Sequence, residues 1–109
     1  MITLWHNPRC SKSRQALALL EGKEVEVRLY LKDAPSLAEI KTLNTALDLP
    51  VLKMMRSGEK QFKEAGLTKT SSDAALLGAM AKHPILIERP IAVKNGRAII
   101  GRPPDNVLT

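Results

Sequence analysis

The chain has 109 residues, 44% of them apolar and 26% charged, which is enough for one compact domain over residues 1–109 and excludes intrinsic disorder. Seventeen basic and eleven acidic residues give a net charge of +6, but no two Lys or Arg residues are adjacent and only three residues are aromatic, which argues against a nucleic-acid-binding surface. The longest apolar run, Ala16 to Leu20, excludes a membrane-spanning helix, and the lack of a secretory pattern near Met1 predicts a cytoplasmic protein.

Residues 2–30 show the pattern of a strand, a helix and a second strand. Residues 2–5 are mostly apolar, and residues 11–21 carry apolar side chains at helical spacing before Gly22, a typical helix end. Residues 24–30 alternate polar and apolar side chains, as a strand with one buried face does. We therefore expect two parallel strands joined by a helical crossover.

The middle of the chain is predicted to be helical. Ser36 and Glu39 form a capping box at the start of a helix over residues 36–48, whose apolar residues recur at helical spacing. Pro50 is suited to open a further helical turn, which would end at Arg56.

Two more helices are expected before residue 84. We expect a short helix that includes Phe62, within a segment that is otherwise polar. A longer one begins at the N-cap candidates Ser71, Ser72 and Asp73 and ends before Pro84, because the residue that precedes a proline disfavours helical backbone angles.

The last part of the chain has the pattern of a β-hairpin. Two β-rich runs, residues 91–94 and 97–100, flank the pair Asn95-Gly96, which suits the positive φ angles of a two-residue hairpin turn. A short C-terminal helix is expected near Pro103-Pro104. The elements together predict an α/β fold with a βαβ unit, a helical middle, a hairpin and a final helix.

Cys10 is the only cysteine, and it lies at the expected start of the first helix. The unpaired N–H groups and the positive dipole end of a helix stabilise an anion there, so we expect an acidic, reactive thiol. Arg9, Lys12 and Arg14 add positive charge, and His6 either adds another charge or shares a hydrogen bond. The alternative is a buried, inert cysteine, which would have no use for such a cationic setting.

A single cysteine limits what the chain does alone. An internal disulfide and a four-thiolate metal site are excluded, and Ser13 stands where a dithiol redox motif has its second cysteine. A second thiol must therefore come from another molecule. Ala16 occupies the position at which the loop of a low-molecular-weight phosphatase would carry an arginine. His6, Cys10 and His83 are the only good nitrogen or sulfur ligands, and we predict no metal site.

Three arginines stand at the ends of expected elements. Arg56 ends a helix, Arg89 precedes the hairpin, and Arg102 follows it. Where strand ends meet at one edge of a sheet, such residues are able to converge on a ligand, and arginine binds tetrahedral oxyanions through paired hydrogen bonds. The alternative is that each arginine is a solvated or carboxylate-paired surface residue.

Three separated segments closely resemble the glutaredoxin-coupled arsenate reductase family: His-Asn-Pro-Arg-Cys-Ser-Lys-Ser-Arg at 6–14, His-Pro-Ile-Leu-Ile-Glu-Arg-Pro-Ile at 83–91 and Gly-Arg-Pro at 101–103. The resemblance covers nearly the whole chain. It implies a thioredoxin-like core with a helical insertion and a cis peptide bond at Arg89-Pro90. Ser11-Lys12, where members best associated with arsenic resistance carry Gly-Thr, and an end at Thr109 indicate a short chromosomal subgroup.

The resemblance also implies roles for individual residues. Cys10 would be the nucleophile, and His6 the neighbour that favours its thiolate. The family's oxyanion-binding arginines match Arg56, Arg89 and Arg102, and the positions that shape its anion loop match Asn7, Ser13 and Arg14. The implied reaction is reduction of arsenate, or a related oxyanion, with no bound cofactor, glutathione as co-substrate and glutaredoxin as protein partner. We expect the protein to be a monomer.

Two other functions fit parts of the pattern. One is a regulator of the same superfamily that binds RNA polymerase without turnover; its dithiol switch is absent here because position 13 is a serine. The other is a glutaredoxin-like transferase that uses a single cysteine on glutathionylated proteins, which would need no arginine triad.

Overall fold

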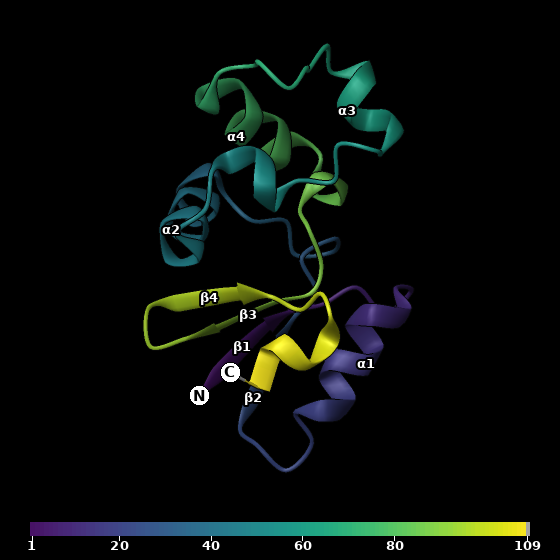
Figure 1. The fold of residues 1–109 in the computed structure, drawn as a ribbon, viewed down its shortest axis with the longest axis vertical. Coiled ribbons are helices and arrows are strands. Elements are labelled where there is room, and N and C mark those ends of the chain that lie inside the picture. The colour runs from purple at the N-terminus through teal and green to yellow at the C-terminus, as the bar shows by residue number, and fades with distance from the viewer. Residues whose placement is uncertain (109) are drawn as a thin grey trace. The chain divides into compact units, whose positions relative to one another are not determined.

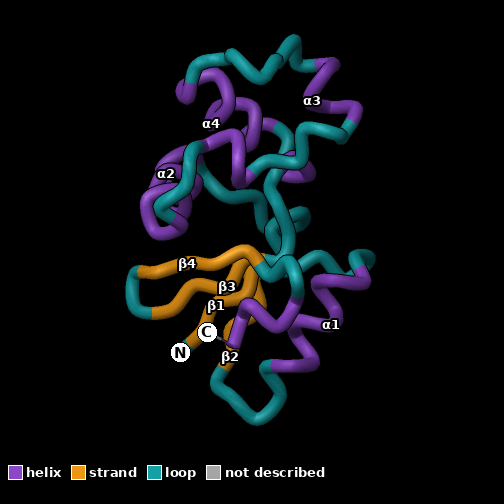
Figure 2. Tube along the Cα trace, viewed as in Figure 1, coloured by secondary structure: helices purple, strands orange, loops and turns teal. Residues whose placement is uncertain are grey.

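A mixed four-stranded sheet is present within residues 1–108, which the computed structural model describes (Figures 1 and 2). Its strand order is β2-β1-β3-β4, with β1 parallel to β2 and antiparallel to β3. This arrangement confirms the predicted parallel pair and the predicted hairpin. The strands are β1 (Ile2–Trp5), β2 (Val25–Arg28), β3 (Ile91–Lys94) and β4 (Arg97–Ile100).

The register of the sheet brings several strand ends to one edge. Trp5, the last residue of β1, lies opposite Arg28 of β2 and Ile91 of β3. Ile91 in turn lies opposite Ile100, the last residue of β4. The chain therefore leaves β1 and β4, and enters β3, at the same edge.

The sheet packs one face against α1 (Ser11–Leu19) and the 3-10 helix η3 (Pro104–Leu108). The buried side chains of this core are Ile2, Leu4, Ala16, Leu20, Ala92 and Val107. Helix α1 ends two residues earlier than predicted, because the N–H of Leu20 already bonds the carbonyl of Leu17 in a tighter turn and Gly22 adopts a φ of 86°.

Strand β2 is shorter than predicted and is not buried on one face. Val27 is 40% exposed, although the alternating pattern predicts that it faces the core. The reason is that β2 is an edge strand, paired only with β1. At the end of the strand, Arg28 lies with its guanidinium carbon 5.3 Å from the centroid of the Trp5 ring.

Helices alone form the middle of the described chain, apart from a bridge between Met55 and Ile87. The capping box is confirmed: Ser36 Oγ accepts from the N–H of Glu39, and Glu39 Oε1 accepts from the N–H of Ser36. Ser72 caps α4 by accepting from the N–H of Ala75. The helical elements are α2 (Leu37–Leu47), η1 (Val51–Met54), α3 (Lys60–Glu64), α4 (Asp73–Lys82) and η2 (Pro84–Leu86).

Two elements of this region differ from the sequence prediction. The turn after Pro50 is a 3-10 helix that stops at Met54, because Met55 has extended backbone angles and forms the bridge. The helix η2 was not predicted; it starts at Pro84, whose ring is compatible with a first helical position.

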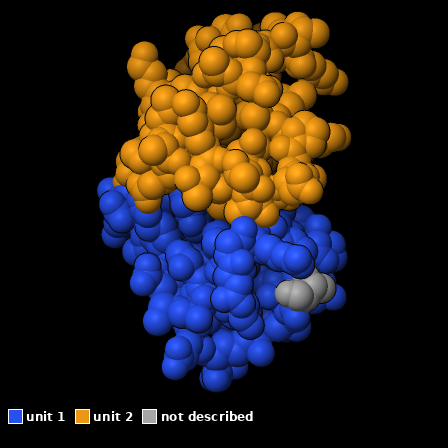
Figure 3. All heavy atoms as spheres, turned by 90° about the vertical axis from the view of Figure 1, so that its left-hand side faces the viewer, with its two compact units in different colours: residues 1–33, 89–109 blue, residues 34–88 orange. Residues whose placement is uncertain are grey.

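The chain divides into two compact units (Figure 3). Unit 1 comprises residues 1–33 and 89–109 and holds the sheet, α1 and η3, whereas unit 2 comprises residues 34–88 and holds the remaining helices. Unit 2 is therefore a helical insertion between β2 and β3, as expected. A single domain over residues 1–109 stays a prediction. No helix within residues 1–108 combines the length and apolarity needed to cross a bilayer.

Gly101 lies where the exit of β4 closely approaches the entry to β3. A Cβ atom at this position would lie 2.7 Å from Cγ of Pro90 and 3.0 Å from Cγ1 of Val107. The N–H of Gly101 also donates to the carbonyl of Pro90 at 2.8 Å. A side chain here would force apart the two segments that carry Arg89 and Arg102.

We expect Gly101→Ala to lower the free energy of unfolding by about 1–3 kcal/mol, because a rigid proline ring leaves no space for the added methyl group. Gly58→Ala is the matched control, since a Cβ atom there meets no atom within 4 Å. Urea unfolding of both variants measures the difference. Equal stability of the two variants would contradict the close approach.

Candidate active site

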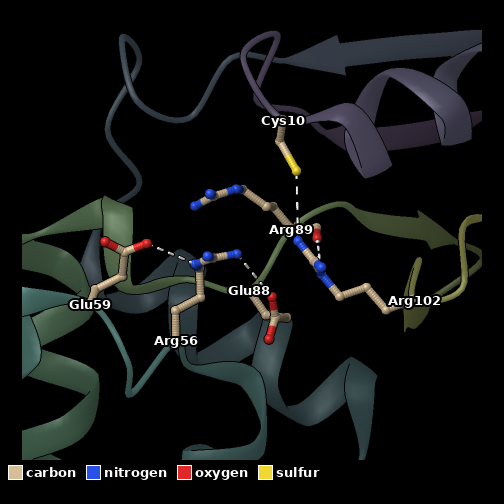
Figure 4. Close-up of polar contacts among 6 residues, drawn as sticks. All are labelled: Cys10, Arg56, Glu59, Glu88, Arg89 and Arg102. Carbon is tan, nitrogen blue, oxygen red and sulfur yellow. Dashed lines mark hydrogen bonds and ion pairs between the residues drawn. The ribbon is translucent and has the colours of Figure 1, made fainter.

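The site is built where the strands of unit 1 end. Cys10 follows β1, Arg89 precedes β3, and Arg102 follows β4. These three strand ends lie at one edge of the sheet, so the segments that carry the three residues start close together although they are far apart in the sequence. Figure 4 shows the side chains of all three residues.

Cys10 is the N-cap residue of α1, as the sequence predicts. Its backbone is extended, with φ −94° and ψ 123°, and its carbonyl accepts the first helical hydrogen bond from the N–H of Arg14 at 3.0 Å. The thiol is partly exposed. The sulfur therefore lies at the end of the helix where backbone N–H groups have no helical partner.

The surroundings of Cys10 favour the thiolate. Partial burial by itself would raise the pKa of the thiol. The backbone N–H of Ser13, the Arg89 guanidinium and the N–H of Lys12 act in the opposite direction, and together they bring the pKa of Cys10 below its ordinary value. The expected acidic thiol thus follows from hydrogen bonds of the first helical turn and one arginine.

Arg102 reaches the sulfur directly. Its Nη2 lies 3.6 Å from Sγ of Cys10, and its Nε donates to the backbone carbonyl of Arg89 at 2.8 Å (Figure 4). Asn106 adds a bond from Nδ2 to the carbonyl of Arg102 at 3.1 Å. The guanidinium is therefore oriented by backbone that belongs to the entry of β3.

Proline peptides flank the hairpin on both sides. The Arg89-Pro90 bond is cis, as the resemblance implies. The Arg102-Pro103 bond is also cis, which the sequence did not indicate.

Ser13 holds the loop between β1 and α1. Its fully buried Oγ accepts from the N–H of Asn7 at 3.0 Å and forms a 2.6 Å hydrogen bond with Nδ1 of His6. The carbonyl of Asn7 accepts from the N–H of Cys10 at 3.0 Å, which closes the turn. Arg14 completes the loop, because its Nη1 donates to the carbonyl of Pro8 at 2.8 Å. Asn7, Ser13 and Arg14 thus shape the loop by direct contacts.

His6 acts through Ser13 in this arrangement. Burial lowers the pKa of His6, and the nearby charge of Arg14 lowers it further, so the neutral imidazole prevails near pH 7. The hydrogen bond of the His6 Nδ1 atom is made with the serine hydroxyl. The role of His6 as the neighbour that favours the Cys10 thiolate stays a prediction.

Arg56 belongs to unit 2 and is described by its contacts there. Its Nε lies 3.1 Å from Oε1 of Glu59, and its Nη1 lies 3.6 Å from Oε1 of Glu88 (Figure 4). Its backbone N–H donates to the carbonyl of Leu86 at 2.7 Å. This is a half-buried, carboxylate-paired arginine, and its participation in oxyanion binding stays a prediction.

Two further groups contribute to the site. Asn106 supports the backbone of Arg102, and the carbonyl of Arg89 orients the Arg102 guanidinium. The sequence pattern predicts neither role, because neither a single asparagine nor a backbone carbonyl belongs to a motif that marks a site.

Comparison with known proteins gives a consistent assignment. Residues 5–109 match the sequence model of the ArsC family. A relative from Neisseria meningitidis serogroup A, named arsenate reductase, is 48% identical, with 97% of this chain and 94% of that protein covered. Protein YfgD of Escherichia coli, named as uncharacterized, is 46% identical, with 98% and 93% covered.

A solved structure extends the similarity to three dimensions. Arsenate reductase from Vibrio cholerae superposes with a TM-score of 0.94 at 51% identity, and the alignment covers 98% of this chain and 94% of that one. This likeness confirms a thioredoxin-like α/β core with a helical insertion. With a family match over residues 5–109 and relatives that share nearly half of their residues along almost the full chain, the protein belongs to the ArsC family.

Proposed function

We propose that the protein is a cytoplasmic oxidoreductase that reduces arsenate, or a related oxyanion, through the thiolate of Cys10. The observation that carries the proposal is the 3.6 Å contact between Nη2 of Arg102 and the sulfur of Cys10. This contact pairs a cation with a thiol whose pKa is already lowered. The relatives named arsenate reductase support the choice of substrate.

The first step is nucleophilic attack of the Cys10 thiolate on the arsenic atom. A sulfur–arsenic bond forms, an arsenic–oxygen bond breaks, and the departing oxygen takes up protons and leaves as water. Arg89 and Arg102 would neutralise the oxyanion and the charge that develops on its oxygens. Both arginines begin from the sheet edge that also carries Cys10, which supports this role.

The remaining steps need thiols from other molecules, because Cys10 is the only cysteine. Glutathione would form a second sulfur–arsenic bond, with loss of another water. A glutaredoxin thiolate would then attack the glutathione sulfur and form a mixed disulfide between glutaredoxin and glutathione. The bond between the glutathione sulfur and arsenic breaks, and its electron pair stays on the arsenic atom and reduces As(V) to As(III). Water finally releases arsenite from Cys10. In sum, arsenate and two thiols give arsenite, one disulfide and one water.

The arginines distinguish this proposal from a simple thiol transferase. Exchange between sulfur atoms requires a thiolate and a leaving thiol but no group that binds a multiply charged oxyanion. Arg102 is held toward the sulfur by the carbonyl of Arg89, which costs side-chain freedom and is useful where an anion must be bound.

The proposal predicts that Cys10→Ser abolishes arsenate-dependent oxidation of NADPH in an assay that couples glutathione, glutaredoxin and glutathione reductase. The serine hydroxyl would not ionise near neutral pH and therefore would not attack arsenic. The melting temperature of the variant serves as the control for folding. Turnover equal to that of the parent protein would overturn the mechanism. Selenate and sulfate in parallel assays would identify the anion.

A second prediction concerns the pH dependence of alkylation by iodoacetamide. The thiolate is the reactive form, so the rate of the parent protein should reach half of its plateau at a lower pH than that of a free cysteine. Arg89→Leu should move this midpoint to higher pH, because the lost guanidinium favours the thiolate. Arg97→Leu, an exposed arginine of the hairpin, is the matched control. Coincident profiles for both variants would show that Arg89 does not act on the thiol.

A third prediction concerns binding of the oxyanion. Arg89→Leu and Arg102→Leu should each lower kcat/KM for arsenate by roughly 100-fold or more, as the loss of one charged donor does at other oxyanion sites. Their unfolding free energies should stay close to that of Arg97→Leu. Steady-state kinetics and urea unfolding measure the two effects. An unchanged kcat/KM would identify these arginines as surface residues.

A further inference from the structure

An apolar hollow lies beside the loop that carries Cys10. It has a volume of about 470 Å³, and the side chains around it include Pro8, Leu29 and Leu31 together with the cations Arg9 and Lys32. Leu31 is 42% exposed. Both rims of the hollow belong to unit 1, one from the loop after β1 and the other from the turn after β2.

The hollow is lined by the residues that come just before Cys10 in the chain. Pro8 and Arg9 directly precede Cys10, and consecutive Cα atoms lie about 3.8 Å apart. The rim is held in place before any partner binds, because Arg14 bonds the carbonyl of Pro8 and the side chain of Asn7 accepts from the N–H of Arg9. A preformed surface loses little entropy on binding.

The charge of the rim is positive. Arg9 and Lys32 are both exposed. The nearest acid along the chain, Asp33, is engaged by Arg28 at 3.0 Å and so does little to offset them. A leucine-lined hollow between two cations is complementary to an apolar side chain flanked by carboxylates.

We infer that this hollow is the docking surface for the protein thiol that completes the reaction, a thiol donor with an apolar residue and an acidic rim beside its reactive cysteine. The inference rests on the proposed function, which requires an external thiol to approach the atoms bound to Cys10. A partner seated on Leu31 and Lys32 would lie against the loop next to that sulfur. A small thiol such as glutathione would need no such surface.

The test uses thiol exchange and no arsenate, so that it is independent of the proposed reduction. Cys10 is first converted to a mixed disulfide with thionitrobenzoate. A glutaredoxin thiolate then attacks the Cys10 sulfur of this disulfide, forms a disulfide bond with Cys10 and expels the coloured thionitrobenzoate anion, whose release reports the rate. Glutathione is used as the small thiol in parallel.

The double variant Leu31→Asn/Lys32→Glu should react about tenfold more slowly with a glutaredoxin that has an acidic rim. Its rate with glutathione should stay within about twofold of the parent's. The matched control is Leu37→Asn/Lys41→Glu, which makes the same changes on α2 at a leucine that is 41% exposed. The control should react like the parent with both thiols.

The charge of the partner supplies a second arm. A glutaredoxin whose rim carboxylates are replaced by lysine should react more slowly with the parent protein, and added salt should reduce the difference between the two glutaredoxins. Equal rates of the parent and the Leu31→Asn/Lys32→Glu variant with the acidic glutaredoxin would overturn the inference. A parent that is dimeric and a variant that is monomeric would also overturn it, since the hollow would then hold a second copy.

The experiments distinguish a failure of the proposed arsenate reduction from a failure of the proposed docking surface. If the parent protein does not turn over arsenate but exchange still depends on Leu31 and Lys32, the docking surface stands and the substrate assignment fails. If arsenate is reduced and the variant keeps the parent's KM for glutaredoxin, the reaction stands and the docking surface fails.

Discussion

The register of the sheet is the constraint on which the candidate site depends. Trp5, Ile91 and Ile100 lie opposite one another, so the exits of β1 and β4 and the entry to β3 share one edge. A shift of one residue would turn every side chain of a strand to the other face and displace these ends. Because the core on the α1 face requires Leu4 and Ala92 to be buried, packing of the sheet also holds the site together.

The chemistry at this edge depends on a balance of opposing electrostatic effects. Burial of Cys10 disfavours its thiolate, while N–H groups of the first turn of α1 and the guanidinium of Arg89 favour it, and the favourable contributions prevail. His6 is kept neutral by its own burial and serves the loop through Ser13. The positive charge near the sulfur is thus supplied by arginines and backbone, neither of which loses its polarity as pH changes near neutrality.

Much of the fold could be predicted because its signals are local. The capping box of Ser36 and Glu39, the Asn95-Gly96 turn and the apolar spacing of the helices each involve residues only a few positions apart. Errors arose where long-range pairing decides the outcome. The exposure of Val27 follows from the edge position of β2, and the turn after Pro50 stops at Met54 because Met55 forms the bridge with Ile87. Neither circumstance is visible in a short window of sequence.

The candidate reactive group and its local setting can be read from the residues alone: a lone cysteine at the expected start of a helix, with basic neighbours and no second thiol. The contact between this cysteine and Arg102 becomes visible only in the folded chain. Arg102 is 92 residues from Cys10, and its contact with the sulfur depends on the strand register and on the carbonyl of Arg89. Arg56 is paired with Glu59 and Glu88 within unit 2, and its part in oxyanion binding stays a prediction. Residue type and local pattern are properties of a segment, whereas convergence is a property of the folded sheet.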